Sequence, residues 1–290
     1  MPKFHLSIPD YNLKEITAVT KAIKSGWISS AGPDVIKFEK FICKKVNAKY
    51  SVALNSGTSA IHLALSVAGV KRGDEVLVQS LTYVASINPI LYLGANPIFF
   101  DVDNNFHLKI DDIYEFLKTQ TVFKNKKCIN KKTKKIIKAL LVTHLWGNVQ
   151  NIQKLKNICK VRNITIIEDA AESLGSKIKI GKKIINCGCQ GNLGCYSFNG
   201  NKIITTGSGG AVVTKNKSFF KNINYLANQS KDDAFHDIHK KMGFNYKLNN
   251  LLSCLGIIQL KKLDNFIMRK KKIHDHYKKE FKNMDNLKLL

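Results

Sequence analysis

The chain has 290 residues, of which 44% are hydrophobic and 23% charged, so it is long enough for one large globular domain with a sizeable core. Its formal net charge is +26, but only three of its 47 basic residues are arginine, the side chain that binds phosphate and guanine bidentately, so we predict no nucleic-acid partner. No apolar run approaches about eighteen residues, so we predict no membrane contact. No secretory signal follows Met1 and the number of cysteines, seven, is odd, so we predict a cytoplasmic protein with free thiols.

Short apolar runs alternate with amphipathic stretches along most of the chain. In chain order we predict a strand at 51–54, a helix at 58–68, a strand at 75–79, a helix at 83–93, a strand at 97–102, a helix at 110–117, a strand at 136–143, a helix at 152–161, and strands at 164–167, 195–198 and 210–214. We predict a solvated loop for the lysine-rich segment 124–135 and two helices from residue 248 onward. The alternation predicts an α/β fold with a mostly parallel central sheet flanked by helices.

Three polar clusters follow predicted strands, at residues 55–59, 143–144 and 168–169. In sheets of this kind, ligands bind beyond the carboxyl ends of the strands. We therefore expect residues from distant parts of the sequence to converge at this edge.

The first cluster, Asn-Ser-Gly-Thr-Ser at 55–59, joins a predicted strand to a predicted helix. A glycine and hydroxyl groups at a helix N-terminus favour an anion such as phosphate, because the free amides and the helix dipole both attract it. A helix N-cap with a glycine turn explains the same residues equally well. The segment is not a Walker A loop, and no Gly-x-Gly-x-x-Gly opens a helix after a strand, so a nicotinamide site is unsupported.

Two further residues have chemistry that fits a cofactor. Asp169 ends a predicted buried strand, where an unpaired carboxylate is costly; a protonated pyridine nitrogen would pair with it, and a helix-capping role is the alternative. Lys202 lies five residues after Ser197 and just before a glycine-rich run that lets backbone approach a ligand. A confined lysine can attack a carbonyl group, whereas most lysines of so basic a chain lie on the surface.

Several motifs in this order resemble the DegT-like (DegT/DnrJ/StrS type) sugar aminotransferases. The motifs are Gly-Thr-Ser at 57–59, Glu-Asp-Ala-Ala at 168–171, Ser-Phe-x-x-x-Lys at 197–202 and Thr-Thr-Gly-x-Gly-Gly at 205–210. The resemblance extends from residue 8 to residue 277. It implies a fold type I pyridoxal-phosphate enzyme that transfers an amino group to a nucleotide-linked keto sugar.

The resemblance also assigns roles to matching positions around pyridoxal 5'-phosphate. Lys202 would attach the cofactor and move the proton, Asp169 would pair with the pyridinium nitrogen, and Tyr83 would stack on the ring. Glu172, where many relatives have glutamine, would lie near the ring hydroxyl. The residues implied to hold the phosphate are Thr58, Ser59 and Ser197, with Asn245 reaching the phosphate of the neighbouring subunit in a homodimer with shared active sites.

The implied substrate site consists of Trp27, Ile28, Ser29 and Ser30. Within the family, segments 172–176, 197–202 and 229–233 are most similar to the legionaminic-acid and bacillosamine branch, called LegC-like. That branch aminates carbon 4 of a UDP-linked 4-keto-6-deoxy-N-acetyl sugar with glutamate as donor. GDP-perosamine synthases are the alternative.

The chain's length sets a second alternative. Members of the resembled family continue past the position of Leu290, so we predict a large cofactor-binding domain at 1–263 and only the start of a small C-terminal domain at 264–290. An inactive truncated homologue is therefore the alternative to an active enzyme. The cluster of Cys187, Cys189 and Cys195 has no fourth ligand at suitable spacing, so we predict no metal site.

Overall fold

The computed structural model describes residues 7–233, 235–284, 287 and 289. Its helices are α1 (Leu13–Lys24), α2 (Pro33–Val46), α3 (Gly57–Val67), α4 (Val84–Tyr92), α5 (Ile110–Thr119), the short 3-10 helix η1 (Leu145–Gly147), α6 (Gln153–Val161), α7 (Lys217–Ala227) and α8 (Asn250–Glu280). Its strands are β1 (Tyr50–Leu54), β2 (Glu75–Gln79), β3 (Asn96–Phe100), β4 (Thr121–Lys124), β5 (Lys127–Asn130), β6 (Ile136–Thr143), β7 (Thr165–Asp169), β8 (Lys177–Ile180), β9 (Lys183–Asn186), β10 (Leu193–Ser197), β11 (Gly210–Thr214), β12 (Lys231–Asp233) and β13 (Ile238–His239).

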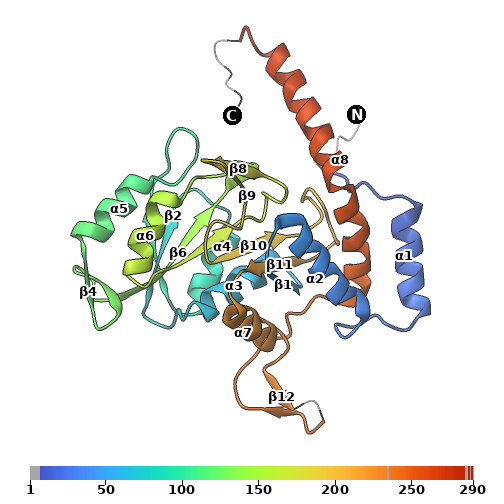
Figure 1. Ribbon diagram of the computed structural model, residues 1–290, viewed down its shortest axis with the longest axis horizontal. Coiled ribbons are helices and arrows are strands. Elements are labelled where there is room, and N and C mark those ends of the chain that lie inside the picture. Colours follow the sequence, from blue (N-terminus) through green and yellow to red (C-terminus); the bar gives the residue numbers. More distant parts are fainter. Residues whose placement is uncertain (1–6, 234, 285–286, 288, 290) are drawn as a thin grey trace.

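The central sheet has the strand order β1-β11-β10-β7-β6-β2-β3 (Figure 1). Strands β10, β7, β6, β2 and β3 run parallel, and β11 is antiparallel to both of its neighbours. The predicted α/β fold with a mostly parallel sheet flanked by helices is therefore confirmed. Parallel strands place their carboxyl ends at one edge, and the polar clusters that follow β1, β6 and β7 lie there.

Helices cover both faces of this sheet. One face packs against α3, α4 and α7. The other packs against α2 and α8 at one end and against α5 and α6 at the other. Successive residues of β2 alternate between the two faces, with Val76 and Val78 in one cluster and Leu77 in the other, as the period of a strand requires.

Two predictions for segments outside the sheet centre were wrong. The tail forms one helix, α8, which projects from the body in Figure 1, and its first half packs against α1 and α2. Its lysine-rich second half contains no Gly or Pro that would break the helix. The lysine-rich segment is partly a β4–β5 hairpin, because Asn125 and Lys126 both adopt positive φ, the geometry of a tight two-residue turn.

Helix α8 passes through the predicted domain boundary between residues 263 and 264. The division into two domains stays a prediction, and residues 285–286, 288 and 290 of its second part lie outside the described residues. All seven cysteines are free thiols. In the described ranges, no helix combines the length and the apolar character needed to cross a membrane.

Candidate active site

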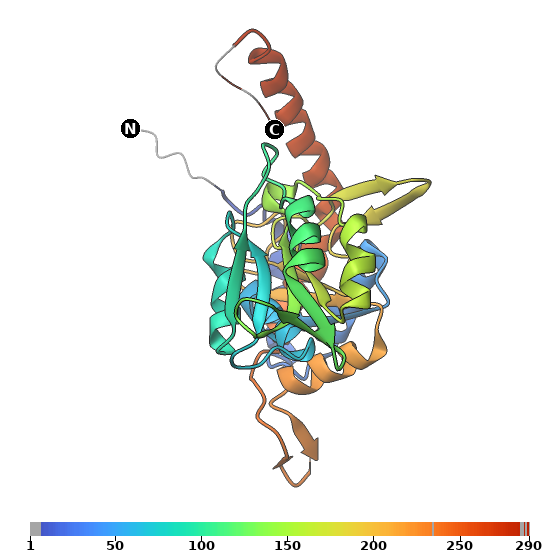
Figure 2. The same cartoon turned by 90° about the vertical axis from the view of Figure 1, so that its left-hand side faces the viewer.

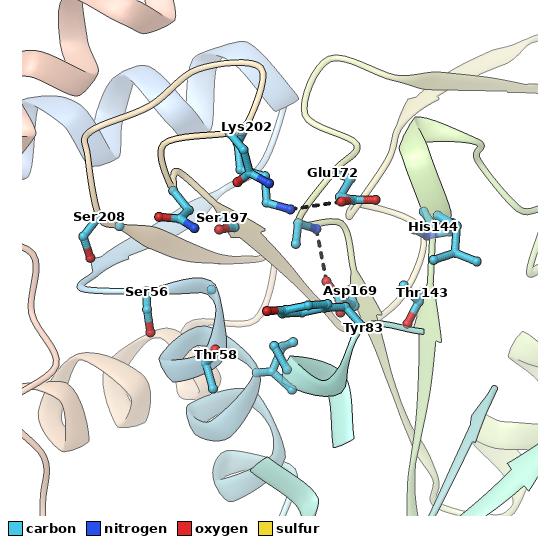
Figure 3. Close-up of a pocket in the computed structure, with 18 residues that line it drawn as sticks. Ser56, Thr58, Tyr83, Thr143, His144, Asp169, Glu172, Ser197, Lys202 and Ser208 are labelled. Atoms are coloured by element: carbon cyan, nitrogen blue, oxygen red, sulfur yellow. Dashed lines mark hydrogen bonds and ion pairs between the residues drawn. The ribbon is translucent and has the colours of Figure 1, made fainter. Parts of the chain in front are cut away.

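A cavity of about 370 Å³ opens at the carboxyl edge of the sheet (Figure 3). It lies between the N-terminus of α3, the ends of β6 and β7, and the loop that joins β10 to β11. Six residues predicted from the sequence line it: Thr58, Tyr83, Asp169, Glu172, Ser197 and Lys202. The fold thus brings together side chains separated by up to 144 positions in the sequence, from Thr58 to Lys202.

Lys202 lies on the β10–β11 loop. The loop is closed by backbone hydrogen bonds, including Lys202 N to Asn199 O at 3.0 Å. The Lys202 side chain is only 16% exposed, and its Nζ lies 3.1 Å from Glu172 Oε1. The other oxygen of Glu172 accepts the backbone N–H of Trp146 at 3.0 Å. Glu172 therefore joins the lysine to the loop after β6.

Asp169 occupies the last position of β7 and is 5% exposed. Its Oδ2 accepts the hydroxyl of Ser86 at 2.6 Å, and its Oδ1 accepts the backbone N–H of Ala171 at 3.1 Å. Burial raises the pKa of the Asp169 carboxyl, although these two hydrogen bonds oppose the rise. Among the described residues it forms no salt bridge, so a cation placed in the cavity would meet a buried carboxylate that lacks one.

The N-terminus of α3 forms the opposite wall. Ser56 is the N-cap, and the helix begins at Gly57 and Thr58. A side chain at position 57 would clash, because an added Cβ would lie 2.8 Å from Ser197 Cβ. The glycine therefore lets the helix N-terminus and Ser197 share one small region, where free amides and two hydroxyl groups favour an anion.

Tyr83 is the N-cap residue of α4 and is 76% exposed. In Figure 3 its ring lies beside Asp169, between the N-terminus of α3 and Thr143. A flat apolar surface of this kind can support a planar ring.

These features together fit pyridoxal 5'-phosphate. The cavity offers an anion site at α3 for the phosphate, a buried carboxylate without a cation for the pyridinium nitrogen, and a lysine for the aldehyde carbon. Three different groups on one ligand are thereby matched by three separate parts of the fold.

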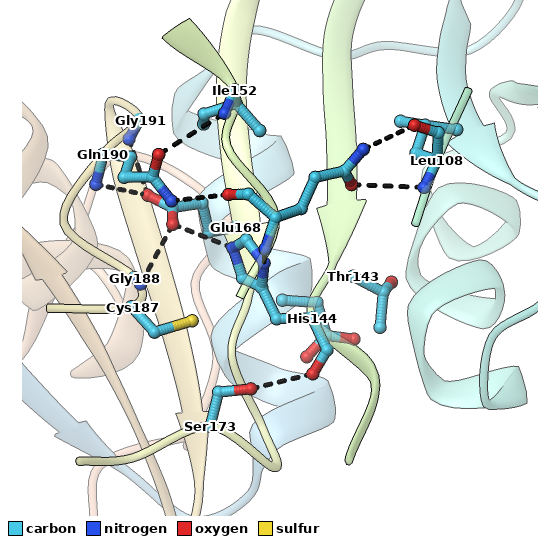
Figure 4. Close-up of polar contacts among 12 residues, drawn as sticks. Leu108, Thr143, His144, Ile152, Glu168, Ser173, Cys187, Gly188, Gln190 and Gly191 are labelled. Carbon is cyan, nitrogen blue, oxygen red and sulfur yellow. Dashed lines mark hydrogen bonds and ion pairs between the residues drawn. The ribbon is translucent and has the colours of Figure 1, made fainter. Parts of the chain in front are cut away.

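Behind the cavity lies a second polar cluster, built on Glu168 (Figure 4). Its carboxylate accepts the backbone N–H groups of Gly188, Gln190 and Gly191 at 2.6–3.0 Å and lies 2.9 Å from Nε2 of His144. The backbone N–H of Gln150 donates to Nδ1 of the same histidine, so the ring proton lies on Nε2. Although Cys187 lies close enough to make a third metal ligand, Glu168 and His144 already use their ligand atoms within the protein.

Other predicted residues lie outside the cavity. The backbone oxygens of Trp27 and Ser29 accept hydrogen bonds from Asn250, at the start of α8, and Ile28 and Ser30 belong to the same α1–α2 connection. The Ser59 hydroxyl is buried and donates to Asn55 Oδ1 at 2.7 Å. Asn245 is exposed, on a segment that pairs with the chain near Asn55. Their predicted roles stay predictions.

The cavity also includes residues to which the sequence assigned no role. Ser56, Thr143 and His144 belong to the polar clusters expected at this edge, and Asn199, Asn201 and Ser208 lie in the segments on either side of Lys202. The positions of Thr143 and His144 directly after a strand were a usable signal, since Asp169 has the same position on the neighbouring strand. Ser86 gave no such signal, because it lies within a helix and reaches Asp169 from behind the cavity wall.

The comparisons with known proteins agree with this geometry. The model of the DegT/DnrJ/EryC1/StrS aminotransferase family matches residues 9–290. The chain is 36% identical over 277 residues to GDP-perosamine synthase from Escherichia coli O157:H7, covering 95% of this chain and 71% of that protein. It is also 36% identical over 269 residues to UDP-4-amino-4,6-dideoxy-N-acetyl-beta-L-altrosamine transaminase from Campylobacter jejuni, covering 92% of this chain and 66% of that protein.

A comparison with solved structures also finds a sugar aminotransferase. The PLP form of the putative sugar aminotransferase Spr1654 from Streptococcus pneumoniae aligns with a TM-score of 0.83 and 25% identity, over 97% of this chain and 72% of that chain. With the family model matched along nearly the whole sequence and the cavity fitting the cofactor, the chain belongs to the DegT/DnrJ/EryC1/StrS aminotransferase family and is a pyridoxal-phosphate-dependent sugar aminotransferase.

Proposed function

We propose that this cavity transfers an amino group to a nucleotide-linked keto sugar, with Lys202 as the catalytic residue. The observation that carries the proposal is the convergence of Lys202, Asp169 and the α3 N-terminus on one cavity. Thr58, Ser59 and Ser197 are assigned to the phosphate, Asp169 to the ring nitrogen, and Tyr83 to the ring face. Trp27 to Ser30 are assigned to the sugar nucleotide.

In this proposal, residues of the cavity bind the cofactor, hold a proton on it and move a proton at the substrate. Bound pyridoxal phosphate supplies an electron sink. Asp169 holds a proton on the ring nitrogen, because its buried carboxylate favours a cation there. Lys202 attaches the cofactor and, when released, moves a proton at the substrate carbon. Glu172 lies within 3.1 Å and receives the lysine's ammonium group when the lysine is free.

We infer that the acceptor is a 4-keto-6-deoxy sugar that receives the amino group at carbon 4, and that the donor is glutamate. A UDP-linked N-acetyl sugar, as in the LegC-like branch, is the first candidate; the similarity to the Campylobacter transaminase, whose name specifies a UDP-linked N-acetyl sugar, supports it. A GDP-linked sugar is the second candidate, because the Escherichia coli relative is named GDP-perosamine synthase at the same identity.

The test is amino transfer by the purified chain supplied with pyridoxal phosphate and glutamate. UDP-4-keto-6-deoxy-N-acetylglucosamine and GDP-4-keto-6-deoxymannose are offered separately, and 2-oxoglutarate and the amino sugar are measured. We expect product from the UDP sugar. Product from the GDP sugar alone would select the perosamine reaction, and no product from either would contradict the proposed function of this chain.

We also propose a homodimer in which Asn245 of one subunit reaches the cofactor phosphate of the other. Support comes from the position of Asn245, which is exposed beside Asn55 yet does not line the cavity of its own chain. A two-fold interface is self-complementary, so each subunit would both give and receive this residue.

Mixed subunits test the shared site. Lys202→Ala and Asn245→Ala subunits should each be inactive alone, and a mixed dimer should regain part of the activity because one of its sites has both residues intact. Failure to recover activity after proven subunit exchange would mean that each site is built from one chain.

We retain the division into a cofactor-binding domain at 1–263 and a second segment at 264–290 as part of this proposal.

A further inference from the structure

Three hydroxyl groups form a row behind Asp169. Ser86 is fully buried on α4, and its Oγ lies 2.6 Å from Asp169 Oδ2 and 2.7 Å from Thr82 Oγ1. Thr82 Oγ1 lies in turn 3.0 Å from Thr143 Oγ1, at the end of β6. Of these groups only Thr143 borders the cavity, where it is seen beside Asp169 in Figure 3. The row therefore lies mostly beyond the reach of a ligand.

When Asp169 is ionised, the three shortest contacts of this row allow one arrangement of the hydrogen atoms. Thr143 Oγ1 also lies 3.5 Å from Ser86 Oγ, a longer alternative for the Thr143 hydrogen that likewise points toward the carboxylate. A carboxylate only accepts, so the single Ser86 hydrogen points to Asp169. Ser86 must then accept from Thr82, and Thr82 must accept from Thr143. All three hydroxyl dipoles point toward the carboxylate, and hydrogen bonds aligned in this way strengthen one another.

We propose that Ser86 is a positioning residue that, supported by Thr82 and Thr143, holds Asp169 ionised and oriented toward the ring nitrogen of the cofactor. The inference rests on the proposed function, because it assumes that Asp169 meets that nitrogen. It adds a residue that never touches the cofactor yet controls the group that does.

The surroundings of Asp169 make such support necessary. Burial raises the pKa of the Asp169 carboxyl, which favours its neutral form. The other titratable groups that face it are Tyr83 at the start of α4, His144 on the segment after β6, Lys202 on the β10–β11 loop and Cys195 within β10. The Lys202 ammonium group lowers its pKa, the His144 ring is neutral, and among the described residues none of the four forms a salt bridge with it. Of its two hydrogen-bond donors, only Ser86 belongs to an element outside the strand-end loop.

The first turn of α4 also positions Tyr83, the residue that we assign to the ring face. The backbone N–H of Ser86 donates to the carbonyl of Tyr83 at 2.9 Å. The same turn therefore fixes the surface under the ring and the carboxylate at its nitrogen, so one short segment sets two contacts of the cofactor.

The experiment measures the dissociation constant of pyridoxal phosphate from its visible absorption, using cofactor-free protein over a range of pH. Ser86→Ala should raise the constant at least about tenfold, the size expected for losing a hydrogen bond to a charged group. The acid limit of tight binding, meaning the pH below which the dissociation constant begins to rise, should also move to higher pH. The reason is that Asp169 protonates more readily without the Ser86 hydrogen bond. Ser253→Ala is the matched control, since Ser253 is equally buried on α8 and donates only to the carbonyl of Asn249.

Thr82→Val is the second variant, because it removes the next hydroxyl at nearly constant volume from a half-buried loop position. It should weaken binding less than Ser86→Ala but shift the acid limit in the same direction, and it decides the question if Ser86→Ala does not fold. Binding equal to the Ser253→Ala control, or weakening without a shift of the acid limit, would overturn the inference while the proposed function stands. A wild-type chain that shows no saturable binding would overturn both.

Discussion

Glu168 and Asp169 are neighbours at the end of β7, and both carboxylates are buried. Successive strand residues face opposite sides, so Glu168 points to the side of Gln150 and Gln190, and Asp169 to the side of α4. Glu168 has four hydrogen-bond partners supplied by the protein, whereas Asp169 has two and borders the cavity. The hydrogen bonds of the first carboxylate are supplied within the protein, whereas we propose that a ligand supplies the cation that pairs with the second.

The largest expected effect on activity lies on the cavity side. Lys202→Ala should lower amino transfer by at least about a thousandfold, because in the proposed function the same amine attaches the cofactor and moves the proton. Its side chain supports only an ion pair with a partly exposed glutamate, so the thermal midpoint should stay within a few degrees of wild type. Near-native turnover by a folded variant would show that another lysine serves the reaction.

Asp169→Asn should come next, with a loss of about a hundredfold in kcat/KM. The ligand-free fold should not suffer, because the hydroxyl row can reverse: an amide N–H donates to Ser86, and Ser86 donates to Thr82. No helix directly follows Asp169, so the helix-capping alternative is wrong, and wild-type activity in this variant would reduce Asp169 to a residue that only holds the turn after β7 through the Ala171 N–H.

The pH dependence of that variant's stability has a definite sign. Burial raises the pKa of Asp169, so folding favours its protonated form relative to the unfolded chain, and the contribution of this group to stability falls as pH rises from about 4 through its folded pKa. The side-chain amide of the Asp169→Asn variant does not ionise. The unfolding free energy of the variant minus that of wild type should therefore increase as the pH rises above about 4, and a difference that decreases with pH would contradict the assignment.

Glu168→Gln should lower stability and leave activity nearly unchanged, the reverse of what we expect for Asp169→Asn. An amide NH₂ in place of either oxygen would face a backbone N–H that now donates to that oxygen, leaving at least one buried donor unpaired. We expect a loss of about 3 kcal/mol in unfolding free energy, measured by denaturant titration, and a change in kcat of less than about threefold in the protein that remains folded. An unchanged midpoint would remove the contrast between the two carboxylates.

Glu172→Gln should have the smallest effect. The amide keeps an oxygen for the Trp146 N–H but removes the negative charge beside Lys202. Cofactor attachment to the ligand-free protein, followed by absorption in rapid mixing, should become about two- to fivefold faster because the amine is less often held as an ion pair. An attachment rate identical to that of wild type would show that the ion pair has no influence on the lysine.

The sequence predicted the sheet better than its surroundings. Strands at 75–79, 136–143 and 210–214 have the predicted bounds, because buried strands read as short apolar runs between turn signals. Helices α1, α2 and α7, and the β8–β9 hairpin that extends from the body in Figure 2, were not predicted. The α1 and α2 helices pack against α8, more than 200 residues away, and no local pattern contains that contact.

The sequence likewise predicted only some of the residues of the candidate site. Lys202 and Asp169 were expected at the site because each lies in a compact motif that resembles the family's. Ser86 and the three backbone partners of Glu168 were not expected, because these hydrogen bonds depend on how distant segments pack. The bond from Ser86 to Asp169, for example, spans 83 positions and depends on how α4 packs against β7. Glu168 and Asp169 were treated as one acidic cluster until the structure separated their faces.

The most direct test of the account is the position of covalent cofactor attachment in this lysine-rich chain. The protein is saturated with pyridoxal phosphate, reduced with borohydride, digested and mapped by mass spectrometry, with Asp169→Asn treated in parallel. We predict one labelled residue, Lys202, and a lower labelled fraction at limiting cofactor in the variant because its ring nitrogen lacks a carboxylate. Label spread over surface lysines, or concentrated on a lysine other than Lys202, would contradict the assignment of this cavity as the active site.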